Sequence, residues 1–382
     1  MRDVVISGAG ITKFGSYPQL PTSATVGNAV LNALKDAGLS WSDIQAAYCG
    51  DEDQGHASGH KALFELGQKG FPIVKTESAC ASGMVAFRLA YQAVAGGFYD
   101  TVLAIGFEKM PRGAIPSTAF RDWQLTMGFN FQPANYALET RKYMEDTGTT
   151  IDDVTNVSVR SRKYGSKNPN AKFQKLITPE DVANSAMICD PFHLFHCSAT
   201  CDGAVAFIIT AKNKAKNPER CVDILATEMT SAFYGGPEYQ CGFMGSVKHP
   251  PKENYHIVAA KAAYEKAGCG PEDIDVIQAY DSMAIAMIWD LEDMLFCKHG
   301  EAAGLLRDGY FEIDGKKPVN VDGGIMARGH AIGASGMAQI HDMVLQLRGE
   351  AGAMQVPNKH RRGLAHCNGA GPTSVVCIFG KD

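Results

Sequence analysis

The sequence predicts an α/β protein built from two similar halves, on three observations. Two segments, which begin at Ala33 and Ala263, carry the same pattern of small and charged residues. The tetrapeptide Ala-Ser-Gly-Met occurs at 81–84 and again at 334–337, and each copy opens an amphipathic helical pattern. Continuous apolar runs separate the helical patterns, as is typical of strands that helices cover on both faces.

The first pair of segments, "ALKDAGLSWSDIQAAYCG" and "AYEKAGCGPEDIDVIQAYDS", predicts two equivalent units. Each unit reads as a helix that ends before a glycine, then a short loop, then a strand. Four pairs of positions match between them: Ala37 and Ala267, Gly38 and Gly268, Asp43 and Asp273, Ile44 and Ile274.

The second pair of segments is followed in each half by a strand-like run, "DTVLAIGFE" in one and "GLAHCNGAG" with "VVCIFG" in the other. Further strands are expected in "RDVVISGAGI", "DVIQAY" and "TSVVCIFG". We therefore divide the chain into halves at 1–245 and 250–382. The first half is longer, and we interpret its excess, around 110–185, as an inserted, partly helical lid.

The composition of the 382 residues is that of an ordinary globular protein, with 45% apolar and 20% charged residues. The net charge of −5 and the lack of a basic stripe disfavour a nucleic-acid binder. We expect no membrane segment and no signal peptide, because no apolar run approaches ~18 residues. The 11 scattered cysteines predict free thiols in a reducing cytoplasm.

Cys80 stands among small residues just ahead of the helical pattern 84–94. Unpaired N–H groups and the positive dipole at a helix N-terminus stabilise a thiolate, so we expect a lowered pKa for Cys80 and a role as nucleophile. A buried packing residue is the alternative, because free cysteines are often buried. The sequence pattern alone leaves both interpretations open.

A glycine-rich loop precedes the second Ala-Ser-Gly-Met helix and contains His330. His330 is thus the counterpart, in the second half, of the neighbourhood of Cys80. If the halves are related by a two-fold-like axis, both helix N-termini face one site and a Cys–His pair becomes possible. The alternative interpretation of His330 is an exposed loop histidine. His366 and Cys367 precede another glycine-rich turn, where the alternative is a strand end with an incidental thiol.

A cluster of potential metal ligands lies in "CDPFHLFHCSATCDGA", but we expect no metal site there. Its spacing fits no standard zinc motif, and adjacent side chains of an extended strand point to opposite faces. The cluster comprises Cys189, His193, His196, Cys197 and Cys201. The early "GAGITKFG" lacks the spacing of a dinucleotide-binding loop.

Taken together, these motifs resemble the thiolase superfamily, in its sterol-carrier-protein-2-like and archaeal branch, over nearly the whole chain. The resemblance implies two βαβαβαββ halves in a five-layer αβαβα sandwich with a lid-like insertion. It also implies that "CDPFHLFHC" is a core strand. The motifs that carry it are "VVISGAGITKFG", "ESACASG", "NPNAKF", "DPFHLFHCSATCDGA", "GGIMARGHAIGASG" and "HCNGAG".

The resemblance implies a chemistry for each matching residue. Cys80 would accept the acyl group of a 3-oxoacyl-CoA, His330 would activate Cys80, and Cys367 would shuttle a proton. Coenzyme A would be a substrate, with no covalently bound cofactor. The chain departs from the family where Tyr280 replaces the usual Asn or His, and we expect its O–H to donate in place of that residue or the water that it holds.

The lid motif "MGFNFQP" has Met127 where the family has histidine, and this departure and the aromatic residues of the lid favour a bulky or aromatic acyl group. Ordinary packing within the lid is the alternative interpretation. The 2-benzoylsuccinyl-CoA thiolase of this branch fits that pattern, with Arg112 or Arg121 near a free carboxylate. We expect the following residues to contact substrate: Met127, Phe129, Gly329, Ser335 and Gly369.

The family default is a homodimer, and members of this branch often act with a small zinc-ribbon/OB-fold subunit, so both partners are expected. Two other functions stay open. One is a thiolase-like retro-aldolase that acts on a CoA thioester through Tyr280, and the other is a non-catalytic acyl-CoA-binding subunit.

Overall fold

The computed structural model describes residues 2–67, 69–111, 113, 122–128, 131–232, 254–357, 361–370 and 373–381. The N-terminal elements are β1 (Val4–Ile11), α1 (Thr22–Ala37), β2 (Ala47–Gly50), α2 (Ser58–Leu63), β3 (Ile73–Thr76), α3 (Ser82–Ala95) and β4 (Thr101–Glu108). The middle elements are α4 (Asp122–Thr126), α5 (Gln132–Thr147), α6 (Ile151–Gly165), α7 (Pro179–Ala183), β5 (Met187–Cys189) and β6 (Phe192–His193). They are followed by β7 (Gly203–Ala211), β8 (Val222–Ser231), α9 (Tyr255–Ala267), β9 (Val276–Gln278), α10 (Ala284–Asp293) and α11 (Ala302–Arg307). The C-terminal elements are α12 (Gly324–Arg328), α13 (Ile332–Arg348), β10 (Arg362–Gly369) and β11 (Thr373–Gly380).

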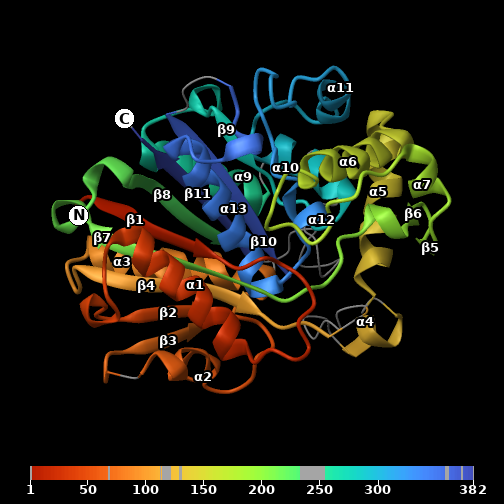
Figure 1. The fold of residues 1–382 in the computed structure, drawn as a ribbon. Helices are drawn as coiled ribbons and strands as arrows, with labels where there is room; N and C mark the ends of the chain where they lie inside the picture. The colour runs from red at the N-terminus through yellow and green to blue at the C-terminus, as the bar shows by residue number, and fades with distance from the viewer. Residues whose placement is uncertain are drawn as a thin grey trace.

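Within the described ranges, the main sheet has nine strands in the order β3-β2-β4-β7-β1-β8-β11-β10-β9 (Figure 1). The strands β2, β4, β7 and β1 correspond in order to β9, β10, β11 and β8. The edge strand β3 has no full counterpart, and a parallel bridge between Ile277 of β9 and Val319 takes its place. In both sets the first neighbours are parallel and the later ones antiparallel. This order favours placing β8 with the second half; the division at 245/250 stays a prediction.

Helices fill the space outside and between the two sets of strands. The helix α1 packs on β1 and β7, and α9 packs on β8 and β11. Between the sets, α3 and α13 pack against each other, α3 also on β2 and β4 and α13 on both β4 and β10. The expected α/β fold with layers α, β, α, β, α is therefore confirmed, and β1 pairs with β8 where the two sets meet.

The duplicated helix ends have the predicted geometry. Gly38 after α1 and Gly268 after α9 adopt the left-handed conformation, with φ of 65° and 62°. In the following turns the Asp43 carboxylate accepts from the Ser40 N–H at 2.8 Å, and Asp273 accepts from the Gly270 N–H at 2.9 Å. Glycine stands at both C′ positions because it adopts a positive φ without steric cost.

The inserted region contributes the helices α4 to α7, which lie with α10 to α12 on one side of the molecule (Figure 1). The expectation of a core strand at "CDPFHLFHC" is wrong. This segment forms the separate two-stranded sheet of β5 and β6, followed by a short 3₁₀ turn. Pro191 has no N–H to donate, so it interrupts the extended run. None of the helices in the described ranges is long and apolar enough to span a membrane.

The contact between α3 and α13 depends on glycines. A Cβ on Gly83 of α3 would lie 2.2 Å from the carbonyl oxygen of Gly333 in α13. A Cβ on Gly106 of β4 would lie 2.4 Å from the same oxygen. The missing side chains let the start of α13 approach both elements, and the Glu108 carboxylate accepts from the Gly333 N–H at 3.0 Å. The N-termini of both central helices are thereby held together.

We expect Gly83→Ala to destabilise the protein by about 1–3 kcal/mol, because the added methyl overpacks a backbone contact that cannot yield. The matched control is Gly27→Ala in α1, where a Cβ would meet nothing within 4 Å. That change should stabilise the helix by up to about 1 kcal/mol. Urea unfolding midpoints of both variants test the prediction, and equal shifts would contradict it.

Candidate active site

Cys80 lies in a 3₁₀ turn, Ala79–Ala81, immediately before α3, as the sequence pattern predicts. Ala79 has a positive φ of 49°, which is unusual for a residue with a side chain. The Glu77 carboxylate accepts from the Ala79 N–H at 2.6 Å, and the Ser82 hydroxyl donates to the Ala79 carbonyl at 2.6 Å. These bonds hold the strained turn and fix the position of Cys80.

Cys367 reaches the same turn from β10 in the other half. Its thiol donates to the Cys80 carbonyl oxygen, with Sγ and O 3.1 Å apart. Two residues further along β10, Gly369 passes so close that a Cβ would lie 2.2 Å from the Ser78 oxygen. Gly369 thus lets β10 approach the turn; its predicted contact with substrate stays a prediction.

His330 lies between α12 and α13 and is held through its backbone. Its N–H donates to the Ala199 carbonyl at 2.8 Å, and its own carbonyl accepts from the Cys201 N–H at 3.2 Å. Gly329 has a φ of 95°, and a Cβ there would lie 2.8 Å from the Cys201 Sγ. These contacts set the direction in which the imidazole leaves the loop.

The hydrogen bonds of Ser335 identify the basic nitrogen of His330. Ser335 Oγ lies 2.8 Å from His330 Nδ1 and donates to the Ala331 carbonyl at 3.0 Å. Because a hydroxyl has one hydrogen, it accepts from Nδ1–H, and Nε2 keeps the free lone pair. Burial lowers the pKa of His330 to about 4, so the ring is neutral at pH 7.

Tyr280 contacts both candidate catalytic groups. Its hydroxyl is hydrogen-bonded to the Cys80 thiol, and its ring meets the His330 ring edge-on, with centroids 6.2 Å apart. The Asp290 carboxylate accepts from the Tyr280 N–H at 3.0 Å and fixes the backbone. Burial, followed by the charge that Cys80 would carry, raises the pKa of Tyr280 well above its usual value, so it is a donor at neutral pH.

The surroundings of Cys80 raise the pKa of its thiol to about 12, so the expected lowered value is wrong. Burial is the largest cause, and Cys80 is 7% exposed; the charge of Glu52 is the second. The Tyr280 hydrogen bond lowers the pKa but does not compensate. Burial and the neighbouring Glu108 in turn raise the pKa of Glu52 to about 7. Desolvation therefore outweighs the helix dipole.

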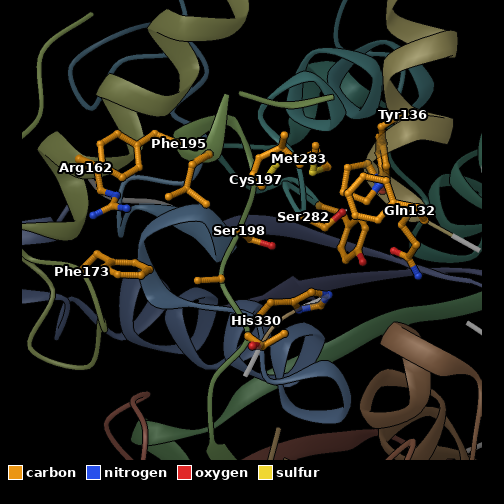
Figure 2. Close-up of a pocket in the computed structure, with 18 residues that line it drawn as sticks. Gln132, Tyr136, Arg162, Phe173, Phe195, Cys197, Ser198, Ser282, Met283 and His330 are labelled. Carbon is orange, nitrogen blue, oxygen red and sulfur yellow. Dashed lines mark hydrogen bonds between the residues drawn. The ribbon is translucent and has the colours of Figure 1, made fainter. Parts of the chain in front are cut away.

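A mainly apolar cavity of about 510 Å³ opens beside these residues (Figure 2). Tyr280 and His330 line it, whereas Cys80 and Cys367 are not among the described residues that do. Tyr280 also binds Cys80, so it connects the thiol with the wall of the cavity. The other walls come from α5, α6 and the segment before β7, and include Phe131, Tyr136, Arg162, Phe173, Phe195 and Cys197.

The lid residues that were predicted to contact the substrate differ in their position relative to the cavity. Met127 is exposed at 67% and is not among the cavity-lining residues; its substrate contact stays a prediction. Phe129, like Arg112 and Arg121, lies outside the described residues. Tyr136, from α5, lines the cavity and hydrogen-bonds Ser282 at 2.9 Å.

The cysteine and histidine cluster is used for local structure. His196 Nδ1 accepts from the His193 N–H at 3.0 Å, and its Nε2 lies 3.0 Å from the Thr155 hydroxyl. Within the described ranges, no group of three or more His, Cys, Asp or Glu residues is arranged to hold a metal ion.

Sequence reasoning missed Glu52 and Arg162. Glu52 belongs to the acidic run "GDEDQG" and Arg162 to the polar run "RSRKYG", both of which read as solvated surface. To predict that Arg162 lines a cavity, one would need to know that α6 packs on the segment before β7, and the sequence does not reveal this contact.

Comparisons with known proteins agree with this geometry. The N-terminal domain model of thiolase matches residues 4–190, and the thiolase C-terminal domain-like model matches residues 252–381. An acetyl-CoA acetyltransferase of Methanothermobacter thermautotrophicus is 34% identical, over 100% of both chains. The benzoylsuccinyl-CoA thiolase subunit BbsB of Thauera aromatica is 32% identical, over 97% of this chain and 95% of its own.

Among solved structures, one named Ltp2-ChsH2(DUF35) aldolase superposes with a TM-score of 0.85 and 26% identity, over 100% of this chain and 98% of that chain. Human mitochondrial 3-ketoacyl-CoA thiolase superposes with a TM-score of 0.73 and 16% identity, over 100% of this chain and 99% of that one, which is a likeness of fold.

The raised pKa of Cys80 predicts slow alkylation by iodoacetamide at pH 7, with a rate that rises about tenfold per pH unit toward pH 12. Above pH 8, where Glu52 is ionised, Glu52→Gln should speed the reaction about fivefold by removing a nearby negative charge. Tyr280→Phe should slow it. Peptide mapping of the adduct, with Cys80→Ser as control, measures the rate. A plateau near pH 7 would contradict the assignment.

Proposed function

The chain belongs to the thiolase family and is an acyltransferase enzyme, and on that premise we propose that it cleaves a 3-oxoacyl-CoA with coenzyme A through an acyl-Cys80 intermediate. The observation that carries the proposal is the chain of contacts that links four groups from both halves around the Cys80 turn. Cys367 contacts the Cys80 carbonyl, and Tyr280 contacts both Cys80 and His330.

In the proposed reaction His330 Nε2 takes the proton of Cys80, and the sulfur forms a bond with the 3-keto carbon. The bond between C2 and C3 breaks, its electron pair moves to C2 as an enolate, and the Cys367 thiol protonates C2. The thiol of coenzyme A then gives its proton to Cys367 and attacks the acyl-Cys80 carbonyl. Cys80 leaves as a thiolate, and His330 returns the first proton to it.

The uncharged forms of Cys80, His330 and Tyr280 at pH 7 fit the roles that the proposal assigns to them. A thiol with a pKa of about 12 needs a base, and His330 is neutral at pH 7 with a free lone pair on Nε2. Because the pKa of His330 is also low, the proposal has the proton move as the sulfur bonds to the substrate, and not before the attack. Tyr280 remains a phenol and donates to Cys80. In the proposal this O–H transfers its hydrogen bond to the substrate oxygen when Cys80 attacks, and thereby stabilises the oxyanion.

A retro-aldolase is the second candidate, because Tyr280 lines the cavity and Cys80 does not, and because the Ltp2-ChsH2(DUF35) aldolase has a similar structure. In that reaction a base removes the proton of a 3-hydroxyl group. The raised pKa of Tyr280 makes it a poor base at neutral pH, which favours the thiolase reaction.

Two variants separate these functions. If the chain is a thiolase, Cys80→Ala should lower kcat for thiolysis at least ~10³-fold, and Tyr280→Phe about 10²-fold, because one removes the nucleophile and the other one hydrogen-bond donor. A panel of 3-oxoacyl-CoA and 3-hydroxyacyl-CoA thioesters supplies the assay. Cleavage of a 3-hydroxyacyl-CoA that survives Cys80→Ala but not Tyr280→Phe would instead establish the aldolase. Coenzyme A binding with no cleavage of either class would favour the non-catalytic subunit.

Ser335→Ala should lower kcat about tenfold with little change in KM, since it removes the bond that fixes the His330 tautomer. Ser335→Thr keeps the hydroxyl and should restore most of the activity. A wild-type kcat in Ser335→Ala would show that Ser335 does not position His330.

We further propose a bulky or aromatic acyl group such as that of 2-benzoylsuccinyl-CoA. The relation to BbsB supports it, as do the aromatic walls formed by Phe131, Tyr136 and Phe195. We place the enzyme in the cytoplasm, with aromatic or fatty acid degradation as its setting, and take coenzyme A as a substrate rather than a bound cofactor.

Two partners complete the proposal. A homodimer is supported by β3, an edge strand whose Val74 is 39% exposed and whose outer N–H and C=O groups suit a second copy. A separately encoded zinc-ribbon/OB-fold subunit is supported by the name of the Ltp2-ChsH2(DUF35) aldolase, which joins two proteins. Light scattering of the purified chain, alone and with that subunit, tests both.

A further inference from the structure

Arg162 of α6 is a partly buried cation in the wall of the cavity. Its guanidinium lies over the Phe173 ring at 4.0 Å from the centroid and faces Phe195 at 5.5 Å. Figure 2 shows it between these two side chains. No carboxylate among the described residues pairs with it, and desolvation is the one influence that acts on its pKa, which falls to about 10. The group therefore stays charged at pH 7.

The neighbours of Arg162 on the same helix are paired differently. Arg160 binds the Glu312 carboxylate at 2.9 Å, and Lys163 binds its other oxygen at 2.7 Å. These two cations serve the packing of α6 on the segment before α12. Arg162 points to the cavity instead, where burying a charge without a counterion is unfavourable. Stacking on Phe173 and Phe195 offsets part of that cost and holds the guanidinium plane.

Arg162 lies at one end of the cavity, away from the candidate catalytic residues (Figure 2). Figure 2 shows Arg162, Phe173 and Phe195 at one end and His330, Ser282 and Tyr136 toward the other. Since the reacting groups lie near His330 and Tyr280, a ligand that fills the cavity places its reactive carbonyl there and a different group at Arg162. Phe173 and Phe195 already cover the faces of the Arg162 guanidinium. A ligand group at this end of the cavity therefore binds to its N–H donors, in the plane of the guanidinium.

We propose that Arg162 binds a carboxylate on the acyl part of the substrate, at the end of the cavity away from His330. This rests on the proposed function and narrows its substrates to acyl thioesters that carry a free acid. Arg112 and Arg121, which the sequence suggested for such a carboxylate, lie outside the described residues, whereas Arg162 lines the cavity.

The cavity favours one carboxylate over the phosphates of coenzyme A. Arg162 is the one permanently charged side chain among the described residues that line it, and the rest of the wall is mainly apolar. One planar guanidinium matches one carboxylate in charge and in geometry. The phosphates carry several charges and call for several cations. A desolvated ion pair is also stronger than an exposed one.

The test measures binding in a Cys80→Ser background, where no acyl transfer to Cys80 occurs. Calorimetry compares succinyl-, glutaryl- and 2-benzoylsuccinyl-CoA with the methyl ester of each. In this background at least one acid should bind ~30- to 300-fold more tightly than its ester. Adding Arg162→Met should reduce that ratio to near one, and adding Arg162→Lys should restore only part of it. The matched control is Lys163→Met, which removes a cation from the same helix and should keep the ratio.

Two results would overturn the proposal. One is that no acid in the series binds better than its ester. The other is that Arg162→Met weakens acid, ester and free coenzyme A equally, which would assign Arg162 to the phosphates. Melting temperatures and circular dichroism of each variant report folding. Because binding here needs no chemistry at Cys80, failure of the thiolase reaction leaves this test intact.

Discussion

The close contact of α3 with α13 is the constraint on which the active site depends. Gly83 and Gly333 meet backbone to backbone, and Gly106 of β4 approaches the same carbonyl oxygen. The first turns of α3 and α13 therefore touch. Cys80 lies in the turn just before α3 and His330 in the loop just before α13, so this contact brings the two residues to the same region. The Glu108 carboxylate strengthens the contact by accepting from the N–H of Gly333, at the positive end of α13.

The same burial that brings the groups together also sets their protonation. Among the described residues, the charges of Glu52 and Glu108 oppose a Cys80 thiolate, and Tyr280 supports it through one hydrogen bond. The site therefore rests as thiol, neutral imidazole and phenol. In the proposed reaction, Cys80 stays a thiol until a substrate supplies an oxygen that takes over the hydrogen bond of Tyr280. Exclusion of water strengthens each of these interactions during the reaction.

Most of the fold followed from local patterns in the sequence. The repeated glycines at 38 and 268 and the two Ala-Ser-Gly-Met segments identified equivalent helices because their backbone requirements are local. Cys80, His330, Cys367 and Tyr280 were proposed as catalytic residues by motif, and the structure brings Tyr280 into contact with both Cys80 and His330. The pKa of Cys80 was predicted in the wrong direction, because a helix N-terminus is visible in sequence and desolvation is not.

The features that escaped prediction depend on contacts between distant segments. The segment 189–197 was expected as a core strand, yet its proline places it in a small separate sheet. Arg162 lies within a charged run, and its contacts with Phe173 and Phe195 in the cavity wall join segments that are distant in the sequence. Long-range packing of this kind leaves no periodic signal in a single sequence.

The most direct test of the central claim is the intact mass of the wild-type protein after incubation with acetyl-, succinyl-, benzoyl- and long-chain acyl-CoA, followed by peptide mapping. The account predicts one acyl adduct, on Cys80, that coenzyme A removes. A protein that binds these thioesters and cleaves its substrate, yet carries no acyl group on Cys80 when the reaction is quenched with acid, would contradict it.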